Sequence, residues 1–194
     1  MDPALALLEF DSIALGIQAG DAMVKRAPVS QIHTGTVHPG RYLVLVAGDV
    51  ASVEEAMQAG KEVAQKDLRD WVFLPHVHPD VVAALGNGRQ QVLGEALGVI
   101  ETGTVAAAIQ AADAGIKGAE VGLWQLRLAD GLGGKGLVLF TGLVADVEAA
   151  VEIGRGRVSA QLIRTVVIPQ MHTDMQTNLA GNGRFGESFN WSVY

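Results

Sequence analysis

The first half of this 194-residue chain is written again in its second half, and this duplication constrains the fold more than any other feature. Glu9 recurs as Glu101, and the residues after it recur at the same spacing. The matching positions are Glu9, Ala14, Ile17, Gln18, Ala19, Asp21, Ala22, Lys25, Ala27 and Val29, which recur as Glu101, Ala106, Ile109, Gln110, Ala111, Asp113, Ala114, Lys117, Ala119 and Val121. Solenoid repeats are only about 20–50 residues long, so a longer unit predicts a whole duplicated domain.

The repeat continues to the end of each copy after a two-residue adjustment of the spacing. Gly40, Gly48, Val53, Glu54, Pro75 and His78 recur as Gly134, Gly142, Val147, Glu148, Pro169 and His172, and Gly86-Asn87-Gly88-Arg89 returns as Gly181-Asn182-Gly183-Arg184. We therefore predict a domain at residues 1–86, a linker at 87–95, a second domain at 96–181 and a Gly-rich, aromatic tail at 182–194. Domains of this size lie within the usual range for independent cores.

Each copy begins with the signals of a strand followed by an amphipathic helix. Residues 4–10 are predicted to form a strand, and Ser12 is the expected N-cap, with Thr104 in the same place in the second copy. Ile13, Ile17, Gly20 and Val24 then follow at helical spacing, and Pro28 ends the helix.

The remainder of each copy predicts three further strands and a second helix. Residues 29–37 form a candidate strand, and the apolar runs 42–47 and 137–141 are typical of central strands buried on both faces. Ser52 starts a capping-box pattern that predicts the second helix, residues 71–74 form the closing strand, and a short helix is expected after Pro79. The predicted fold class is α+β, with two tandem ferredoxin-like β-α-β-β-α-β domains.

Composition excludes several classes of function. The net charge of −7 argues against nucleic-acid binding, because no basic stripe is present to neutralise phosphates. The chain has no cysteine, so it forms no disulfide and no thiolate site. It shows neither a signal peptide nor an 18-residue apolar run, and we expect a soluble, cytoplasmic protein without a membrane span. No credible catalytic motif is present, so an enzyme is not expected.

Four phrases of the second copy resemble the bacterial microcompartment shell domain, and the first copy matches at the corresponding places. The match covers nearly the whole chain except the linker and the last dozen residues. The phrases are Val99-Ile100-Glu101-Thr102, Ala111-Ala112-Asp113-Ala114-Gly115-Ile116-Lys117, Gly142-Leu143-Val144-Ala145-Asp146-Val147 and Ile168-Pro169-Gln170-Met171-His172, with Leu8-Glu9, Gly20-Asp21-Ala22-Met23-Val24-Lys25, Gly48-Asp49-Val50 and Leu74-Pro75-His76-Val77-His78. Two tandem copies are similar to the tandem-domain shell proteins. Pro39-Gly40-Arg41 and Gly133-Gly134-Lys135 most resemble their propanediol-utilisation type.

This resemblance implies a homotrimer that forms a pseudohexagonal tile of six domains. Tiles of this family join other shell proteins edge to edge around encapsulated enzymes, so the implied location is a microcompartment shell. The loop between the second and third strands lines a central pore in such tiles. Ring closure also has a physical basis, because a heterologous contact that closes on itself produces a ring.

The resemblance assigns the pore to one loop in each copy. In the first copy the loop holds His38, Pro39 and Gly40, and His38 stands where the propanediol-utilisation type carries a cysteine that holds an iron–sulfur cluster. Three interpretations of His38 stay open: a hydrated loop histidine, a constriction whose charge changes near neutral pH, or a metal site made by three imidazoles on the axis. Apart from that metal, no cofactor is expected.

The corresponding loop of the second copy is rich in glycine. It contains Asp130, Gly131, Leu132, Gly133 and Gly134. Asp130 contributes to the field of the pore, extends a metal site with the histidines, or is an ordinary solvated carboxylate. The loop also satisfies G-x-G-x-x-G, but it precedes an apolar strand instead of opening a helix, so a nucleotide site is rejected. We expect these glycines to permit a close backbone approach.

Other polar residues allow both a functional and a structural interpretation. His76 and His78 form a conceivable metal dyad, although structural histidines are favoured because the second copy keeps only His172. Lys25 and Lys117 match the edge lysine of the family and are expected to contact neighbouring tiles. The alternative for these lysines is an ordinary helical pair with an aspartate one turn earlier.

The C-terminal tail is unusually rich in aromatic residues. The tail contains Phe185, Phe189, Trp191 and Tyr194, in a chain with only 5% aromatic residues. It either docks on a neighbouring subunit or on encapsulated cargo, or it is a frayed terminus.

The main hypothesis for the function is a shell tile that passes small polar metabolites. The alternatives are a metal-bearing or iron–sulfur electron-transfer tile, and a tandem ferredoxin-like sensor with a small molecule between its domains.

Overall fold

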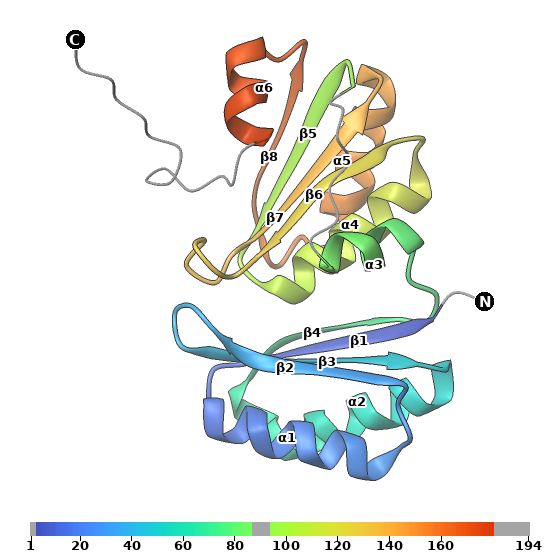
Figure 1. Ribbon diagram of the computed structural model, residues 1–194, viewed down its shortest axis with the longest axis vertical. Helices are drawn as coiled ribbons and strands as arrows, with labels where there is room; N and C mark the ends of the chain where they lie inside the picture. The colour runs from blue at the N-terminus through green and yellow to red at the C-terminus, as the bar shows by residue number, and fades with distance from the viewer. Residues whose placement is uncertain (1–2, 87–93, 181–194) are drawn as a thin grey trace.

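The computed structural model describes residues 3–86 and 94–180, and each stretch contains one four-stranded antiparallel sheet with its helices (Figure 1). We refer to the first stretch as domain 1 and to the second as domain 2. Domain 1 consists of β1 (Ala4–Phe10), α1 (Ile13–Arg26), β2 (Gln31–Val37), β3 (Arg41–Gly48), α2 (Val50–Ala64), a 3-10 turn η1 (Gln65–Asp67), β4 (Leu68–Leu74) and α3 (Pro79–Leu85). Domain 2 consists of β5 (Ala96–Thr102), α4 (Val105–Gly118), β6 (Gly122–Leu128), β7 (Gly136–Gly142), α5 (Val144–Arg157), β8 (Leu162–Pro169) and α6 (Thr173–Ala180).

The two sheets have the same topology, which confirms the predicted α+β fold with two β-α-β-β-α-β units. The strand order is β2-β3-β1-β4 in domain 1 and β6-β7-β5-β8 in domain 2. Helices α1 and α2 cover the face of the first sheet that points away from domain 2, and α4 and α5 cover one face of the second sheet (Figure 1). We call the other face of each sheet, which its own two long helices leave uncovered, its open face.

The helix starts were predicted correctly for α1 and α4 but not for α2. Ser12 accepts a hydrogen bond from the Leu15 amide, and Thr104 accepts the equivalent bond in domain 2. Ser52 is not an N-cap, because Asp49 lies three residues earlier and its carboxylate accepts the Ser52 amide at 2.9 Å. A carboxylate at the N-terminus also interacts favourably with the helix dipole, so the helix begins at Val50.

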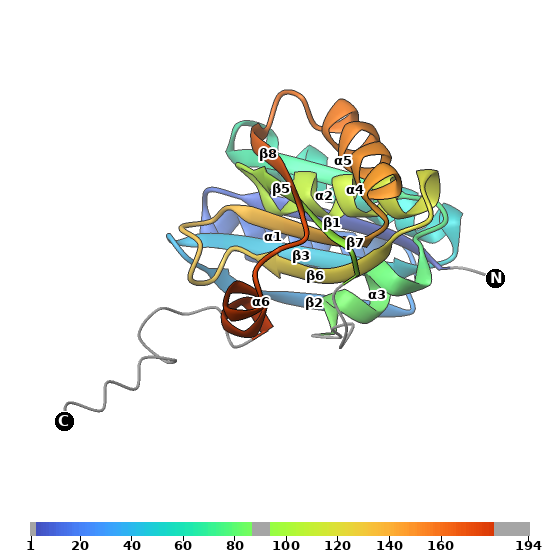
Figure 2. The same ribbon diagram turned by 90° about the horizontal axis from the view of Figure 1, so that it is seen from above.

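Each domain ends in a short helix after its last strand. The expected helix after Pro79 is confirmed as α3, and α6 is its counterpart. From above, α3 and α6 lie on one side of the molecule and α5 lies on the other (Figure 2). The longest helix of the described residues is α2, with 15 residues, and none of the helices in residues 3–86 and 94–180 is long and apolar enough to cross a membrane.

The two domains share one hydrophobic cluster, so they do not meet only through their surfaces. A smaller cluster lies between the first sheet and helices α1 and α2. The larger cluster joins the open face of domain 1, the buried side of α3 and the part of the domain 2 core that lies beneath α4 and α5. Burying apolar area is the dominant favourable term in folding, so this shared cluster fixes the two domains against each other.

Domain 1 is less completely buried than domain 2, and the prediction for its first apolar run was wrong. The stripe Ile13, Ile17 and Val24 of α1 is exposed, while small residues and Met23 face the core. The first apolar run was expected to be buried on both faces, but Leu43 and Leu45 of β3 are only half-buried. The corresponding strand β7 is much more completely buried. The difference arises because other parts of the chain cover these positions only in domain 2.

Candidate functional site

The contact between the two domains is built around helix α4. Val105, Ile109 and Ile116 are buried in the shared cluster, together with Val72 and Leu74 of the domain 1 sheet. Helix α4 therefore packs on its own sheet with one side and against domain 1 with another. We call this contact the inner interface.

A buried carboxylate connects the inner interface electrostatically. Glu9 is fully buried on β1, where it accepts a hydrogen bond from Arg41 Nη1 at 2.7 Å and another from the Val105 amide at 2.9 Å. The second donor belongs to the first turn of α4, whose amides carry the positive end of the helix dipole. Burial raises the pKa of Glu9 above its ordinary value, and the bonds from Val105 and Arg41 oppose that shift.

A second polar contact holds the loop between β4 and α3. The carboxylate of Asp113 on α4 accepts the His78 amide at 2.8 Å and pairs with Lys117 Nζ at 2.6 Å. The same ammonium group donates to the carbonyl of His76. In domain 1, the corresponding Lys25 pairs with Asp21 on the exposed surface of α1. Both helical pairs that the sequence suggested are present, and the role of the two lysines at a tile edge stays a prediction.

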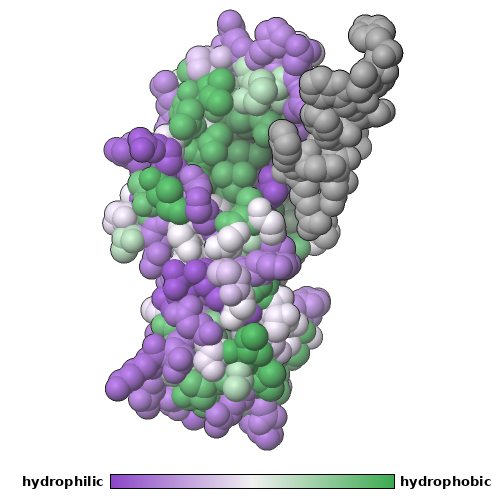
Figure 3. Space-filling view, turned by 90° about the vertical axis from the view of Figure 1, so that its left-hand side faces the viewer, coloured by the Kyte–Doolittle hydropathy of each residue, from purple (hydrophilic) through white to green (hydrophobic). Residues whose placement is uncertain are grey.

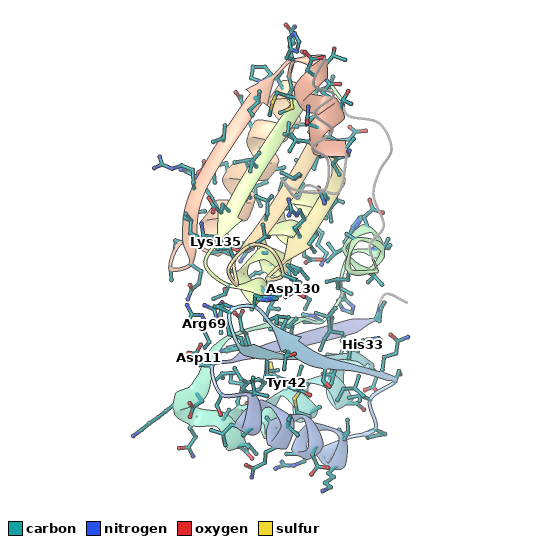
Figure 4. All side chains as sticks on the ribbon, turned by 60° about the vertical axis from the view of Figure 1, so that its left-hand side comes forward. Asp11, His33, Tyr42, Arg69, Asp130 and Lys135 are labelled. Carbon is teal, nitrogen blue, oxygen red and sulfur yellow. The ribbon has the colours of Figure 1, made fainter. Side chains whose placement is uncertain are left out.

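The two predicted pore loops lie next to each other at the boundary between the domains. The His38 amide donates to Asp130 Oδ1 at 3.0 Å, and His38 Nδ1 lies 3.2 Å from the same oxygen. Figure 4 shows Asp130 at this boundary, facing the hairpin of β2 and β3. The His38 side chain remains 81% exposed, so it is available to solvent or to other chains.

Glycines allow the second loop to approach the first. Gly131, Gly133 and Gly134 all have positive φ, a conformation that glycine adopts without strain. A Cβ atom on Gly134 would lie 2.6 Å from Arg41 Nη1, and Arg41 donates to the Gly134 carbonyl at 3.0 Å. The backbone of this loop thus lies directly against the Arg41 side chain, and a close approach of the loops at the centre of a ring stays a prediction. The loop leads directly into β7 and opens no helix, in agreement with the rejection of a nucleotide site.

The recurring histidine at the end of each last strand has a structural role. His78 Nδ1 accepts the Asp80 amide at the start of α3, and His172 Nδ1 accepts the Asp174 amide at the start of α6. Within residues 3–86 and 94–180, no three or more His, Asp or Glu side chains of one chain lie close enough to hold a metal ion. A metal site at His38 would need imidazoles from several chains and stays a prediction.

Several apolar positions are buried in one domain and exposed at the equivalent place in the other. On the first long helix the exposed copy is in domain 1, and on the last strand it is in domain 2. Ile17 is 55% exposed, whereas its counterpart Ile109 is fully buried. Val166 on β8 is 44% exposed, whereas its counterpart Val72 is 2% exposed. The view of Figure 3 shows an apolar surface on domain 2, on the side where β8 lies. Each domain thus exposes one surface whose equivalent in the other domain is buried in the inner interface.

Sequence reasoning missed the polar part of the inner interface. Glu9 and Glu101 were recognised only as members of the repeat, and no role was assigned to them. A useful signal was available, because each repeated glutamate has a basic partner where the neighbouring strand begins: Arg41 is the first residue of β3, and Lys135 directly precedes β7. The predicted linker lies largely, and the predicted tail entirely, outside the described residues.

The comparisons with known proteins agree in family and in extent. The family model for the BMC domain matches residues 4–77 and again 96–171. The bacterial microcompartment shell protein PduT of Citrobacter freundii is 37% identical over 177 residues, which cover 90% of this chain and 96% of that protein. The carboxysome assembly protein CcmO of Synechocystis sp. is 26% identical over 196 residues, covering 92% of this chain and 65% of that protein.

Two solved structures are similar in fold over most of this chain. The crystal structure of a microcompartment protein from Desulfitobacterium hafniense DCB superimposes with a TM-score of 0.79 and 41% identity, covering 91% of this chain and 99% of that one. A fused permuted hexameric shell protein of the RMM microcompartment gives a TM-score of 0.60 at 19% identity, covering 81% of this chain and 84% of that one, which is a likeness of fold alone.

Proposed function

Because the chain belongs to the BMC domain family and is a tandem-domain bacterial microcompartment shell protein, we propose that three copies close into a ring of six domains that serves as one shell tile. The observation that carries this proposal is the pair of unmatched surfaces on the two domains. The two domains meet through two different surfaces, one from each copy of the fold. Domain 1 therefore keeps the helix-side surface free, and domain 2 keeps the strand-side surface free. Repeating the contact between chains closes the ring if the rotation is favourable.

The apolar parts of the free surfaces match the inner interface position by position. Ile13, Ile17 and Val24 of α1 are exposed, and their counterparts Val105, Ile109 and Ile116 are buried against domain 1. On the other side, Val166 of β8 and Met175 of α6 are exposed, and their counterparts Val72 and Val81 are buried. Large exposed apolar patches mark interaction sites. In the ring, the α1 patch of one chain packs against the β8 and α6 patch of the neighbouring chain.

The polar contacts of the inner interface can be repeated in the same way. Glu101 pairs with Lys135 at 2.7 Å, as Glu9 does with Arg41, and it is available to accept the Ile13 amide at the start of α1 of the next chain. Lys25 is likewise available to donate to the carbonyl of Gln170, the counterpart of His76. The same charged groups therefore support both contacts.

The contact between His38 and Asp130 supports a pore at the centre of this ring. Asp130 is the counterpart of His38 in the repeat, so the two residues are related by one step of the six-fold pseudosymmetry. In a six-membered ring, the distance between neighbouring equivalent points equals their distance from the axis. Residues that touch their own counterparts therefore lie close to the axis, and we assign the pore to the loops at 38–40 and 130–134.

The polar rim of this pore suits small polar metabolites. Each chain contributes His38 and Asp130, and the three-fold ring contains three of each. Because the chain has no cysteine, it cannot hold an iron–sulfur cluster through thiolates. Histidine and aspartate are ligands for zinc and similar metals, so metal analysis of the purified tile and of its His38→Ala variant tests this second use of the loop. Equal metal content in both proteins would rule out a metal site at His38.

The ring predicts a tile that joins other shell proteins through its outer edge. PduT is named as a microcompartment shell protein and CcmO as a carboxysome assembly protein, and this chain contains the BMC domain twice. We propose that Lys25 and Lys117 lie near the boundaries between tiles, as the resemblance implied. Sheet formation by the purified protein, compared with that of Lys25→Ala and Lys117→Ala, tests this assignment.

The ring itself is tested by measuring the mass of the assembled protein. Sedimentation velocity is expected to give the mass of three chains, and Ile17→Asp is expected to give a folded single chain because it places a charge in the contact. Ala51→Asp is the control, since Ala51 and its counterpart Ala145 are exposed in both domains and lie outside the repeated contact. A single-chain mass for the unchanged protein would contradict the ring.

The pore assignment is tested in the same cysteine-free chain. A short bifunctional thiol reagent is expected to join His38→Cys chains into covalent dimers and trimers, because their thiols meet near the axis. Asp174→Cys on α6 places an equally exposed thiol away from the axis and serves as the control. Equal cross-linking of the two variants would show that residue 38 does not line the pore.

A further inference from the structure

Domain 1 contains an apolar pocket of about 850 Å³ on its open face. The floor is formed by the leucines of the two central strands, Leu5, Leu7, Leu43 and Leu45. Val82 and Leu85 of α3 form one wall. The rim includes Pro3 and Ala4 at the start of β1, and it is more polar at the start of β2, where Ser30, Gln31 and His33 lie. A pocket of this size and lining is suited to bulky apolar side chains.

The same place in domain 2 is filled by the protein itself. Trp124 on β6 is 4% exposed and packs with Leu97, Leu139 and Met171, while Leu179 of α6 closes the cluster. Domain 1 has no aromatic side chain at this position: its edge strand β2 carries His33, which Figure 4 labels, and Gly35, above which a Cβ atom would meet nothing within 4 Å. The pocket is therefore the volume that an aromatic side chain occupies in the other copy.

The repeat indicates which segment reaches this pocket. Helix α3 ends at Leu85, and residue 94 lies only two residues before β5, which starts at Ala96. In the proposed ring, α6 takes the place of α3, and β1 of the next chain takes the place of β5. Leu179 of α6 is the counterpart of Leu85, so at the same offset of 94 residue 188 corresponds to residue 94 and is expected beside the start of β1 of the next chain. Pro3 and Ala4 at that point belong to the rim of the pocket.

The residues beyond this point have the composition that the pocket requires. Residues 189–194 include Phe189, Trp191 and Tyr194, in a chain that has few aromatic residues elsewhere. Six residues span up to about 20 Å when extended, which is enough to enter the pocket from its rim. Aromatic side chains bury a large area at low entropic cost and dominate contacts of this kind.

We propose that the C-terminal segment 189–194 of one chain docks in the domain 1 pocket of the next chain in the ring, with Trp191 taking the place that Trp124 has in domain 2. This inference rests on the proposed three-chain ring. The segment then acts as a strap that links each chain to its neighbour, in addition to the contact between α1 and β8.

The absence of cysteine from the chain allows a direct test in the full-length protein. The double variant His33→Cys with Ser192→Cys places one thiol on the pocket rim and one beside Trp191. Mild oxidation is expected to give covalent dimers and trimers on a non-reducing gel. The matched control is His33→Cys with Asn182→Cys, which moves the second thiol ten residues back along the same segment. Adding Phe189→Ala and Trp191→Ala is expected to slow bridging about tenfold or more, because burial of the aromatics holds the segment in place.

The outcomes separate this inference from the ring. Three-chain mass with bridges between chains, above the level of the control, supports both. Three-chain mass with bridging no greater than in the control, or only within single chains, overturns the strap and leaves the ring intact. A small molecule found in the pocket by native mass spectrometry of the unchanged tile would also overturn it. A single-chain mass overturns the ring and the strap together.

Discussion

Helices α1 and α4 occupy the same place in the two copies of one fold, yet one exposes the apolar stripe that the other buries. Both pack on their own sheet through small residues, with Gly16 and Gly20 in α1 and Ala108 and Ala112 in α4. Their second apolar stripe faces solvent in α1 and faces domain 1 in α4. The difference shows that this stripe serves contact between domains and is not part of either domain's own core.

The open faces of the two sheets differ in the opposite sense. In domain 2, Trp124 fills the open face beside β7, whereas in domain 1 the same region is a pocket. The stripe on α1 and the pocket are thus two places where domain 1 depends on something beyond itself. Four experiments test the differences between the two copies and the contacts of the inner interface that depend on them.

The largest effect is expected from Trp124→Ala. Removing this side chain opens in domain 2 the cavity that domain 1 already has, and large-to-small changes of this kind cost about 3–5 kcal/mol. Urea denaturation is expected to show that loss in the free energy of unfolding. Leu45→Ala is the comparison, because Leu45 lines the existing pocket and is half-buried, so its loss is smaller. Equal losses would mean that the pocket is as well packed as domain 2.

The next effect compares the two apolar stripes. Ile109→Ala is expected to lower the free energy of unfolding by about 2–5 kcal/mol at every protein concentration, because the contact lies within one chain. Ile17→Ala is expected to lower it only where chains associate, so its effect grows with protein concentration. Thermal denaturation over a hundredfold range of concentration distinguishes the two. A concentration-independent loss for Ile17→Ala would place its contacts within the chain.

A smaller effect is expected for the paired lysines. Lys117→Met removes the donor to His76 and leaves the buried Asp113 carboxylate with one partner fewer, at a cost of about 1–3 kcal/mol. Lys25→Met removes an exposed pair, which contributes about 0–1 kcal/mol in dissociated chains. Urea denaturation at low protein concentration measures both. A loss for Lys25→Met as large as that for Lys117→Met would contradict the comparison.

The smallest effect concerns pH and Glu9. Burial raises the pKa of Glu9 above its ordinary value of 4.5, so in the window between 4.5 and the raised pKa the folded chain binds more protons than the unfolded chain. The contribution of Glu9 to the free energy of unfolding therefore falls as pH rises through this window. Glu9→Gln removes this fall, and urea denaturation at a series of pH values measures it. Parallel curves for the two proteins would show that the pKa is not raised.

Particular residues show how far the sequence could be interpreted. The paired recurrence of Ser12 with Thr104 located two helix starts, and the apolar runs located the central strands, because local hydrogen bonding and hydrophobic patterning act over a few residues. The same patterning does not say what the apolar stripe of α1 contacts, since Ile17 has the spacing of a core residue and of an interface residue alike. Ser52 was predicted to cap the second helix, whereas Asp49 does so; serine and aspartate are both good N-caps, and only the backbone distinguishes the two positions.

The sequence by itself determined that the chain is one fold written twice, and it located the two loops that the structure brings together. A duplicated pattern is visible in one dimension, and so are glycines and caps that act locally. Only the tertiary structure decided which apolar stripe is a core and which is a contact, and that Glu9 is buried beneath the start of α4. Those features depend on surfaces that are far apart in the chain, and burial is a property of the assembled surfaces and not of the residues alone.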